Sequence, residues 1–316
     1  MGSKDIIDMK KRSISSSFLE QLKTGSLKSI TDYVRVDPYL DLELRGDRVM
    51  IYYRGGKVLT VDEKGLLTGL TDEYYLSPDT ERILPSIDVL HDYLAHAKHI
   101  VDIHESTQNS KLGEKEIQQR VVYENNLSVN ADKTDYFIAD VEWADNKVLK
   151  GRVDIVAFCW KHKKPRNRIV QLTLIEVKQG DKAIKSLSGL KKHYDDYISF
   201  KKDQVSVNRV AKDMLLVLKQ KKELGLVKGL DNLFEKKITK TDASGNIVER
   251  RVEMAPQIEA EPDFLFLLAN YHHYSSNLQI ECEDKDWTDD CKFINASFCG
   301  YGLYKDLIKT KKELTF

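Results

Sequence analysis

Two charged residues close an apolar run near the middle of the chain. Glu176 and Lys178 end residues 172–178, and Asp154 lies in a second apolar run, residues 151–156. Because strand side chains alternate, Glu176 and Lys178 would share one face of a sheet. Charged groups in such runs are costly to bury unless they pair or bind a metal ion. Two carboxylates and a lysine in this setting form the set of residues that a Mg²⁺-dependent phosphodiester hydrolase needs.

The context of this triplet distinguishes it from similar ones. Charged residues make up 32% of the chain, so acidic-X-Lys triplets are expected by chance. Other examples lie in polar stretches, at residues 8–10, 62–64, 145–147, 235–237 and 283–285. Only residues 176–178 end an apolar run, and there an aspartate, Asp154, precedes them on another apolar run.

This arrangement resembles the PD-(D/E)XK nuclease superfamily. Asp154 and Glu176-Val177-Lys178 match its motif, within a predicted order of helix, three strands and helix. The resemblance implies an α/β fold with a restriction-endonuclease-like core. In that core a mixed central sheet is flanked by helices, and the acidic residues and the lysine lie near one end of the sheet. A further strand of the core would be residues 262–270.

This chain departs from the family pattern at two places. Val153 stands where the proline of the family's name would be. Many relatives carry Gln-X-X-X-Tyr in the helix after the lysine, and no glutamine is present here. Tyr194 or Tyr197 would take the tyrosine place, with His193 as a substitute for the polar partner.

The resemblance also implies a role for each residue. Asp154 and Glu176 would give carboxylate oxygens to one or two Mg²⁺ or Mn²⁺ ions, with the Val177 carbonyl as a further ligand. Lys178 would orient or deprotonate the attacking water, or stabilise the transition state.

A glutamate on the preceding helix often completes such a site. Residues 113–118 offer two candidates, Glu114 and Glu116. Glu114, one turn before Ile117, is the better match and would bind the metal directly or through water. Glu116 remains the second choice.

Composition limits the classes of function. The chain of 316 residues has 50 Lys and Arg against 50 Asp and Glu, so its net charge predicts no broad attraction to nucleic acid. Local basic clusters remain at residues 161–166, 182–192 and 219–222. No apolar run reaches membrane-spanning length, and no Walker-type loop or dinucleotide-binding glycine pattern is present. The 4 cysteines lack paired spacing, which favours reduced thiols in a cytoplasmic protein.

Hydrophobic patterning divides the chain into two regions. Residues 1–105 are predicted to form a small β-rich region of unassigned role, and residues 106–316 the nuclease-like domain. Strands are expected at residues 40–44, 49–53, 58–61, 136–143, 148–158, 168–178 and 262–270, with a hairpin over 236–253. Helices are expected at residues 16–22, 87–104, 112–124, 181–200, 204–224 and 304–312.

Together these features predict a metal-dependent nuclease that hydrolyses DNA phosphodiester bonds. The preference for DNA over RNA, and a role in defence or repair, come from the resemblance alone. One alternative is a catalytically inactive module with the same fold that binds nucleic acid or another protein. Another is a protein-interaction factor whose N-terminal region contacts a partner. No membrane partner is expected, and a homodimer is left open.

Overall fold

The structure is a computed structural model of the chain. The residues that it describes are 10–71, 75–76, 80, 82–107, 113–160, 167–180, 183–185, 189–241, 247–269, 276–283, 286–296 and 300–314. Among the helices in these ranges, none combines the length and the apolar character that crossing a bilayer requires.

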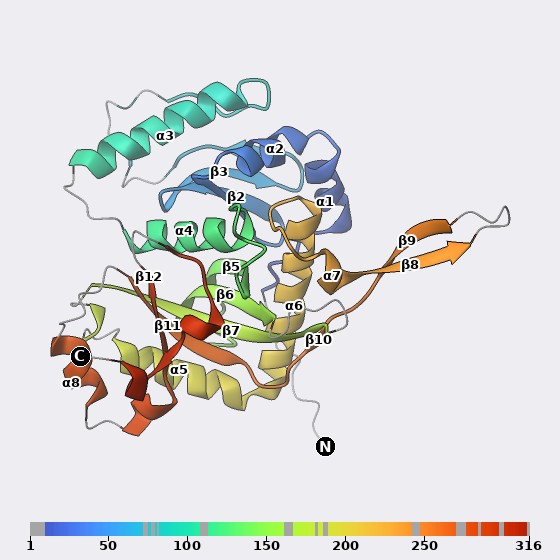
Figure 1. Cartoon of the computed structure of the whole chain (residues 1–316). Coiled ribbons are helices and arrows are strands. Elements are labelled where there is room, and N and C mark those ends of the chain that lie inside the picture. The colour runs from blue at the N-terminus through green and yellow to red at the C-terminus, as the bar shows by residue number, and fades with distance from the viewer. Residues whose placement is uncertain are drawn as a thin grey trace, which may run out of the picture.

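A mixed sheet forms the centre of the molecule (Figure 1). Its strands run in the order β13-β12-β11-β7-β6-β5, and β10 also pairs with β7. β7 is antiparallel to β6 and parallel to β11, so the sheet changes direction at β7. The strands are β5 (Tyr136–Ala144), β6 (Arg152–Trp160), β7 (Ile169–Gln179), β10 (Gln257–Ile258), β11 (Asp263–Ala269), β12 (Lys292–Ala296) and β13 (Lys309–Thr310). β7 is buried over nearly its whole length, as expected for a strand covered on both faces.

Helices cover both faces of this sheet (Figure 1). They are α4 (Glu114–Asn126), α5 (Leu190–Lys202) and α6 (Gln204–Glu223). On one face, Ile117 of α4 belongs to the same hydrophobic cluster as Ile175 of β7. On the other, Tyr197 of α5 stacks on Phe264 of β11 with ring centroids 4.8 Å apart. The predicted α/β class, with a mixed central sheet flanked by helices, is confirmed.

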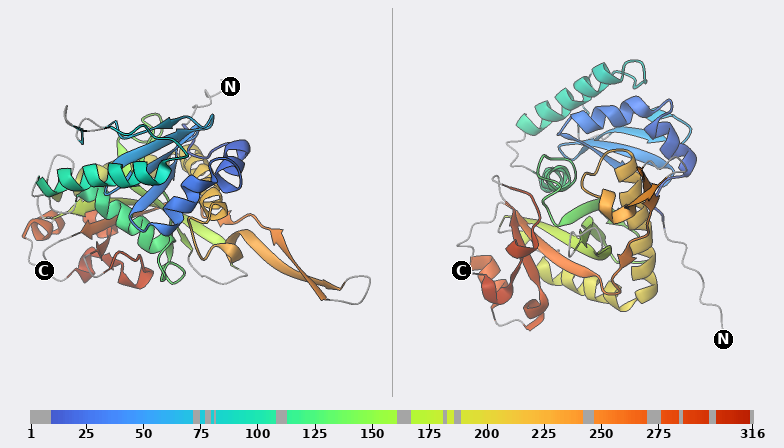
Figure 2. Two further views of the ribbon diagram at one scale, coloured as in Figure 1. Left: turned by 90° about the horizontal axis from the view of Figure 1, so that it is seen from above. Right: turned by 45° about the vertical axis from the view of Figure 1, so that its right-hand side comes forward.

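The N-terminal region forms a second, smaller sheet (Figure 2). Its antiparallel strands follow the order β1-β2-β3-β4, and the strands predicted there are present. Arg54 and Gly55 turn the chain between β2 and β3 with φ of 48° and 83°, a left-handed conformation that favours glycine. The elements are α1 (Ser16–Lys23), α2 (Lys28–Val36), β1 (Leu40–Leu44), β2 (Arg48–Tyr53), β3 (Gly56–Asp62), β4 (Leu67–Thr68) and α3 (Leu90–Thr107).

Two helix predictions differ from the structure. The helix after β7 begins at Leu190 rather than at residue 181. The helix expected at residues 304–312 is wrong, because the segment consists of two 3-10 turns, Lys305–Leu307 and Lys311–Glu313, on either side of β13. β13 pairs with the start of β12, so its backbone groups are satisfied in the sheet. The helices not anticipated are α2, α7 (Asp231–Phe234), α8 (Ser276–Cys282) and the 3-10 turn Asp286–Asp290, and the strands not anticipated are β4, β10, β12 and β13.

Some sequence features fall outside the described residues. These are the basic cluster at residues 161–166, parts of the cluster at 182–192, and Cys299. The three described cysteines, Cys159, Cys282 and Cys291, are buried free thiols.

A two-stranded hairpin projects from the body of the molecule (Figures 1 and 2). It consists of β8 (Glu235–Thr241) and β9 (Ile247–Glu253), which pair antiparallel. The hairpin predicted over residues 236–253 is therefore confirmed.

A buried ion network joins the N-terminal sheet to the main body. Lys221 of α6 donates to the Glu43 carboxylate of β1 at 2.7 Å, and the two residues are 1% and 0% exposed. Arg45 donates to the Asp140 carboxylate and, at 2.9 Å, to the Val141 carbonyl, both on β5. Buried charges are tolerated only when their partners are in place. The network therefore fixes β1 against β5 and α6.

Removing one partner from this network should destabilise the fold far more than breaking an exposed pair. Lys221→Ala is expected to cost about 3 kcal/mol, the lower end for a buried pair, because Arg45 stays 3.6 Å from Glu43. Lys219→Ala, on the same helix, breaks an exposed pair with Glu253 and is expected to cost about 0–1 kcal/mol. Urea unfolding measures both losses. Equal losses would contradict the role assigned to the network.

Candidate active site

Strands β6 and β7 separate at one end, and a side chain bridges them there. Their paired register runs from Trp160↔Val170 to Ile155↔Ile175 and stops. Beyond it, the Val177 N–H donates to Asp154 Oδ2 at 2.8 Å instead of to a backbone carbonyl of β6. The N–H and C=O of one strand residue point to the same side, so the Val177 carbonyl also faces this opening.

The three central residues of the predicted site lie together at this opening. The Asp154 carboxylate lies against the β7 backbone at Val177, and the alternation of β7 puts Glu176 and Lys178 on one face beside it. Lys178 Nζ donates to Glu176 Oε1 at 3.0 Å, and His193 Nε2 of α5 lies 3.0 Å from the same oxygen. Asp154, Glu176 and Lys178 are 3%, 5% and 6% exposed. The sequence prediction that these side chains converge agrees with this geometry.

The electrostatics show that the carboxylates are crowded. Burial raises the pKa of Asp154 well above its usual range, and the negative charges of Glu176 and Glu114 raise it further. Burial also raises the pKa of Glu114, where Lys178 opposes the effect and Glu176 adds to it. Glu114 at the start of α4 therefore lies within electrostatic reach of the strand residues.

Glu176 behaves differently from its neighbours. Burial acts to raise its pKa, but the hydrogen bond from His193 and the charge of Lys178 outweigh burial and lower it. Glu176 is thus the carboxylate that stays ionised most readily. Asp154 is the one whose ionisation most needs an added cation.

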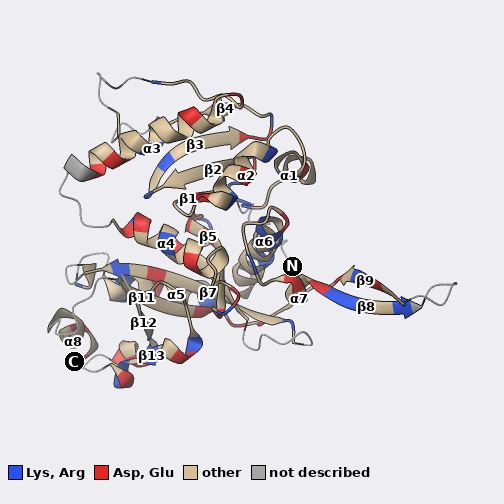
Figure 3. Cartoon of the chain, turned by 45° about the horizontal axis from the view of Figure 1, so that its top comes forward, with Lys and Arg blue, Asp and Glu red and all other residues tan. Residues whose placement is uncertain are grey.

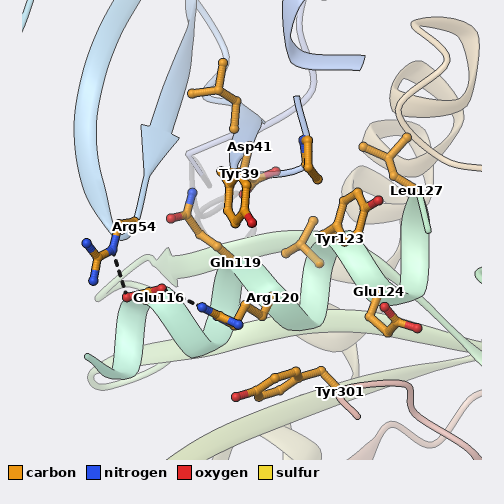
Figure 4. A pocket seen from close by; sticks show the side chains of 13 residues that line it. Tyr39, Asp41, Arg54, Glu116, Gln119, Arg120, Tyr123, Glu124, Leu127 and Tyr301 are labelled. Carbon is orange, nitrogen blue, oxygen red and sulfur yellow. Dashed lines mark hydrogen bonds and ion pairs between the residues drawn. The ribbon is translucent and has the colours of Figure 1, made fainter. Parts of the chain in front are cut away.

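The neighbouring glutamate of α4 points elsewhere. Glu116 pairs with Arg54 Nε at 3.2 Å and with Arg120 Nη2 at 3.0 Å (Figure 4). It lines a cavity of about 360 Å³ between the N-terminal sheet and α4, together with Tyr39 and Tyr301. Of the two candidates, Glu114 is the one whose pKa is shifted by the charges of Lys178 and Glu176.

The α5 helix carries His193, Tyr194 and Tyr197. His193 is its residue in contact with Glu176. Tyr197 instead donates to the Pro262 carbonyl at 2.8 Å, and the Tyr194 ring packs against Trp287. His193 is therefore the residue of the three that reaches the acidic cluster, whereas both tyrosine side chains contribute to packing.

Glu142 and Arg152 lie near the site and were not singled out from the sequence. Glu142 of β5 raises the pKa of both Asp154 and Glu114, and it pairs with Arg152 at 2.5 Å. Glu142 has a φ of 55°, which is uncommon for a residue with a Cβ and follows an irregularity of β5 between Ile138 and Asp140. The only sequence signal was an acidic residue near the end of a predicted strand.

The oxygen atoms of the site are of the type that a divalent cation binds. Within the described residues, no group of three or more His, Cys, Asp or Glu side chains is spaced to hold a metal ion. The hydrogen bonds use Asp154 Oδ2 and Glu176 Oε1. Their second oxygens and the Val177 carbonyl are hard donors of the kind that Mg²⁺ and Mn²⁺ prefer. The crowding of three carboxylates also favours a bound cation, so the residues fit the group chemically.

No family model, no curated protein and no solved structure matches the chain.

The raised pKa of Asp154 predicts how stability depends on pH without metal. Because the folded pKa lies above the unfolded one, the stabilising contribution is present at low pH and is lost as the pH rises through the folded value. Asp154→Asn keeps an oxygen for the Val177 N–H and removes the charge. In EDTA the variant should therefore melt at a higher temperature than wild type at pH 8, and the gap should close towards pH 4.

Thermal unfolding by circular dichroism measures this gap. Asp195→Asn serves as the control, because Asp195 lies exposed on α5 and pairs there with Lys191. A pH-independent gap for Asp154→Asn, or the same gap in the control, would count against carboxylate crowding at the site.

Proposed function

We propose that the chain is a metal-dependent nuclease that hydrolyses DNA phosphodiester bonds on a restriction-endonuclease-like core. The observation that carries the proposal is the meeting of Asp154, Glu176 and Lys178 at the open end of β6 and β7, with Glu114 in electrostatic contact. This residue set matches the chemistry of phosphodiester hydrolysis. The choice of DNA, and a role in defence or repair, rest on the family resemblance alone.

The order of elements supports the restriction-endonuclease-like core. α4 precedes the antiparallel strands β5, β6 and β7, and α5 follows them. β11 then lies beside β7 and parallel to it, as the further strand of the family core would. The acidic residues and the lysine are near one end of this sheet, where the resemblance implies them.

The site residues divide the chemical work. A bound Mg²⁺ or Mn²⁺ supplies Lewis-acid chemistry, making a water molecule more acidic and neutralising charge on the scissile phosphate. Asp154, Glu176 and the Val177 carbonyl would hold the ion, with Glu114 bound directly or through water. The Val177 N–H keeps the Asp154 side chain in place by donating to its Oδ2, with the nitrogen and the oxygen 2.8 Å apart.

Lys178 and His193 act around the metal ligands. Lys178 donates to the attacking water or to a phosphate oxygen and so stabilises the charge of the transition state. Its contact with Glu176 keeps the ammonium group at the site before substrate binds. His193 contacts the same oxygen and orients Glu176.

One observation favours the alternative of a catalytically inactive module. Lys178 and His193 both engage Glu176, and the described side chains form no group spaced to hold a metal ion. In that case the ion pairs would satisfy the buried charges, and the fold would serve to bind nucleic acid or a protein partner.

Cleavage of labelled DNA tests the proposal. Wild type should cut in Mg²⁺ or Mn²⁺ and not in EDTA, and Lys178→Ala or Glu176→Ala should lower the rate at least about 100-fold. Circular dichroism should show that the variants remain folded. Binding without cleavage of any single- or double-stranded DNA or RNA would instead establish the inactive module.

A matched pair of variants tests the assignment on α4. Glu114→Gln should lower the cleavage rate about 10- to 100-fold, as expected for a supporting metal ligand. Glu116→Gln removes the same charge two residues later, where the partners are Arg54 and Arg120, and should leave the rate within about threefold of wild type. The two variants are compared by their single-turnover cleavage rates, measured at a temperature well below the unfolding temperature of each. The opposite ranking would assign the role to Glu116.

A further inference from the structure

The β8–β9 hairpin is an arm that the main body does not cover. It extends away from both sheets (Figures 1 and 2), and β9 is exposed at every position. Ile247 is 74% exposed and Val248 is 47% exposed. Exposed aliphatic side chains on a projecting element are candidates for contact with a partner.

The register separates the side chains of the arm into two faces. Directly paired residues share a face, and faces alternate along each strand. One face, called here the basic face, consists of the pairs Lys236↔Val252, Ile238↔Arg250 and Lys240↔Val248. The opposite face consists of Glu235↔Glu253, Lys237↔Arg251 and Thr239↔Glu249.

The opposite face neutralises its own charges and turns towards the body. Lys237 lies 3.8 Å from Glu249, and Arg251 pairs with Glu235 at 3.1 Å. The Glu235 and Glu253 carboxylates also pair with Lys222 and Lys219 of α6. No net attraction for an anion remains on this side.

The basic face, in contrast, carries only positive charge. Its six residues are three cations and three aliphatic side chains, without an acidic residue. Within the described part of the chain, Lys236, Lys240 and Arg250 make no ion pair. The blue segments of β8 in Figure 3 mark lysines on the projecting arm. On a chain whose net charge is zero, a face of this kind is a local site for a polyanion.

We propose that the basic face of the arm binds duplex DNA. The major groove of B-DNA admits a two-stranded β-ribbon, and Lys and Arg along such a ribbon reach the phosphates that border the groove. The aliphatic side chains between the cations suit apolar contacts with thymine methyl groups. The choice of DNA as the polyanion rests on the proposed nuclease function. The arm's own contribution is binding, not cleavage.

The arm would contact DNA away from the site of cleavage. The chain leaves β9 for β10, which pairs with Ile169 and Val170 at the start of β7. Glu176 and Lys178 lie at the other end of that strand, about 20 Å further along at ~3.3 Å per residue. The arm thus lengthens the footprint of the protein on DNA and leaves the reacting atoms to the acidic cluster.

A matched pair of double variants tests this proposal. Lys236→Gln with Arg250→Gln removes one lysine and one arginine from the basic face. Lys237→Gln with Arg251→Gln removes the same charges, on the same two strands, from the opposite face. Fluorescence anisotropy with a labelled duplex of about three helical turns measures affinity in EDTA, so binding is read without cleavage.

The basic-face variant should bind about tenfold more weakly at low salt. Its slope of log K against log salt concentration should fall by about 1.8, or ~0.9 for each lost phosphate contact. The opposite-face variant should stay within about twofold of wild type, with an unchanged slope. Equal losses in both variants, or none in either, would overturn the proposal.

The same variants separate DNA binding from contact with a second copy of the chain. If the arm pairs with another chain, the basic-face variant changes the sedimentation coefficient while its DNA affinity stays at the wild-type value, and the proposal fails. Loss of cleavage in Lys178→Ala with unchanged anisotropy leaves the arm proposal standing. If wild type does not cleave DNA but the predicted anisotropy difference is seen, the nuclease function is wrong and the arm proposal holds.

Discussion

The hydrogen bond from the Val177 N–H to the Asp154 carboxylate is the contact on which the site depends. At this point β6 and β7 have stopped pairing, and the backbone N–H would otherwise be buried without a partner. Asp154 accepts this hydrogen bond in place of a backbone carbonyl of β6, which fixes the position of one of its carboxylate oxygens. The Val177 carbonyl faces the same opening, and the alternation of β7 adds Glu176 and Lys178. One local departure from regular pairing thus assembles most of the donor set.

The position of the helix glutamate depends on a different constraint, the packing of α4. Its apolar residues fix it against one face of the sheet, which brings Glu114 to the open strand end. On the outer side, Glu116 pairs with Arg54 of the N-terminal region. The buried Lys221–Glu43 pair ties that region to α6. The N-terminal sheet therefore braces the helix that carries Glu114, which gives the sheet a structural part in the proposed chemistry.

The features that follow from strand alternation could be predicted from the sequence. Those that depend on how a helix is rotated or on an irregularity in a strand could not. Glu176 and Lys178 share a face because their separation equals the period of a strand, and that can be predicted. The choice between Glu114 and Glu116 required the rotation of α4 about its axis. Glu142 depends on an irregularity of β5 and a positive φ, which no residue pattern indicated. The expected C-terminal helix failed because its residues find backbone partners on β12 instead.

Asp154, Glu176 and Glu114 are proposed to act together as one site for a divalent cation. Calorimetric titration with Mn²⁺ tests it most directly, because it does not depend on knowing the nucleic-acid substrate. Wild type and the Glu116→Gln control should take up Mn²⁺ with the same affinity, whereas Asp154→Asn and Glu176→Gln should lose that binding. No uptake by wild type, or equal uptake by Asp154→Asn, would rule out a cation site built on these carboxylates.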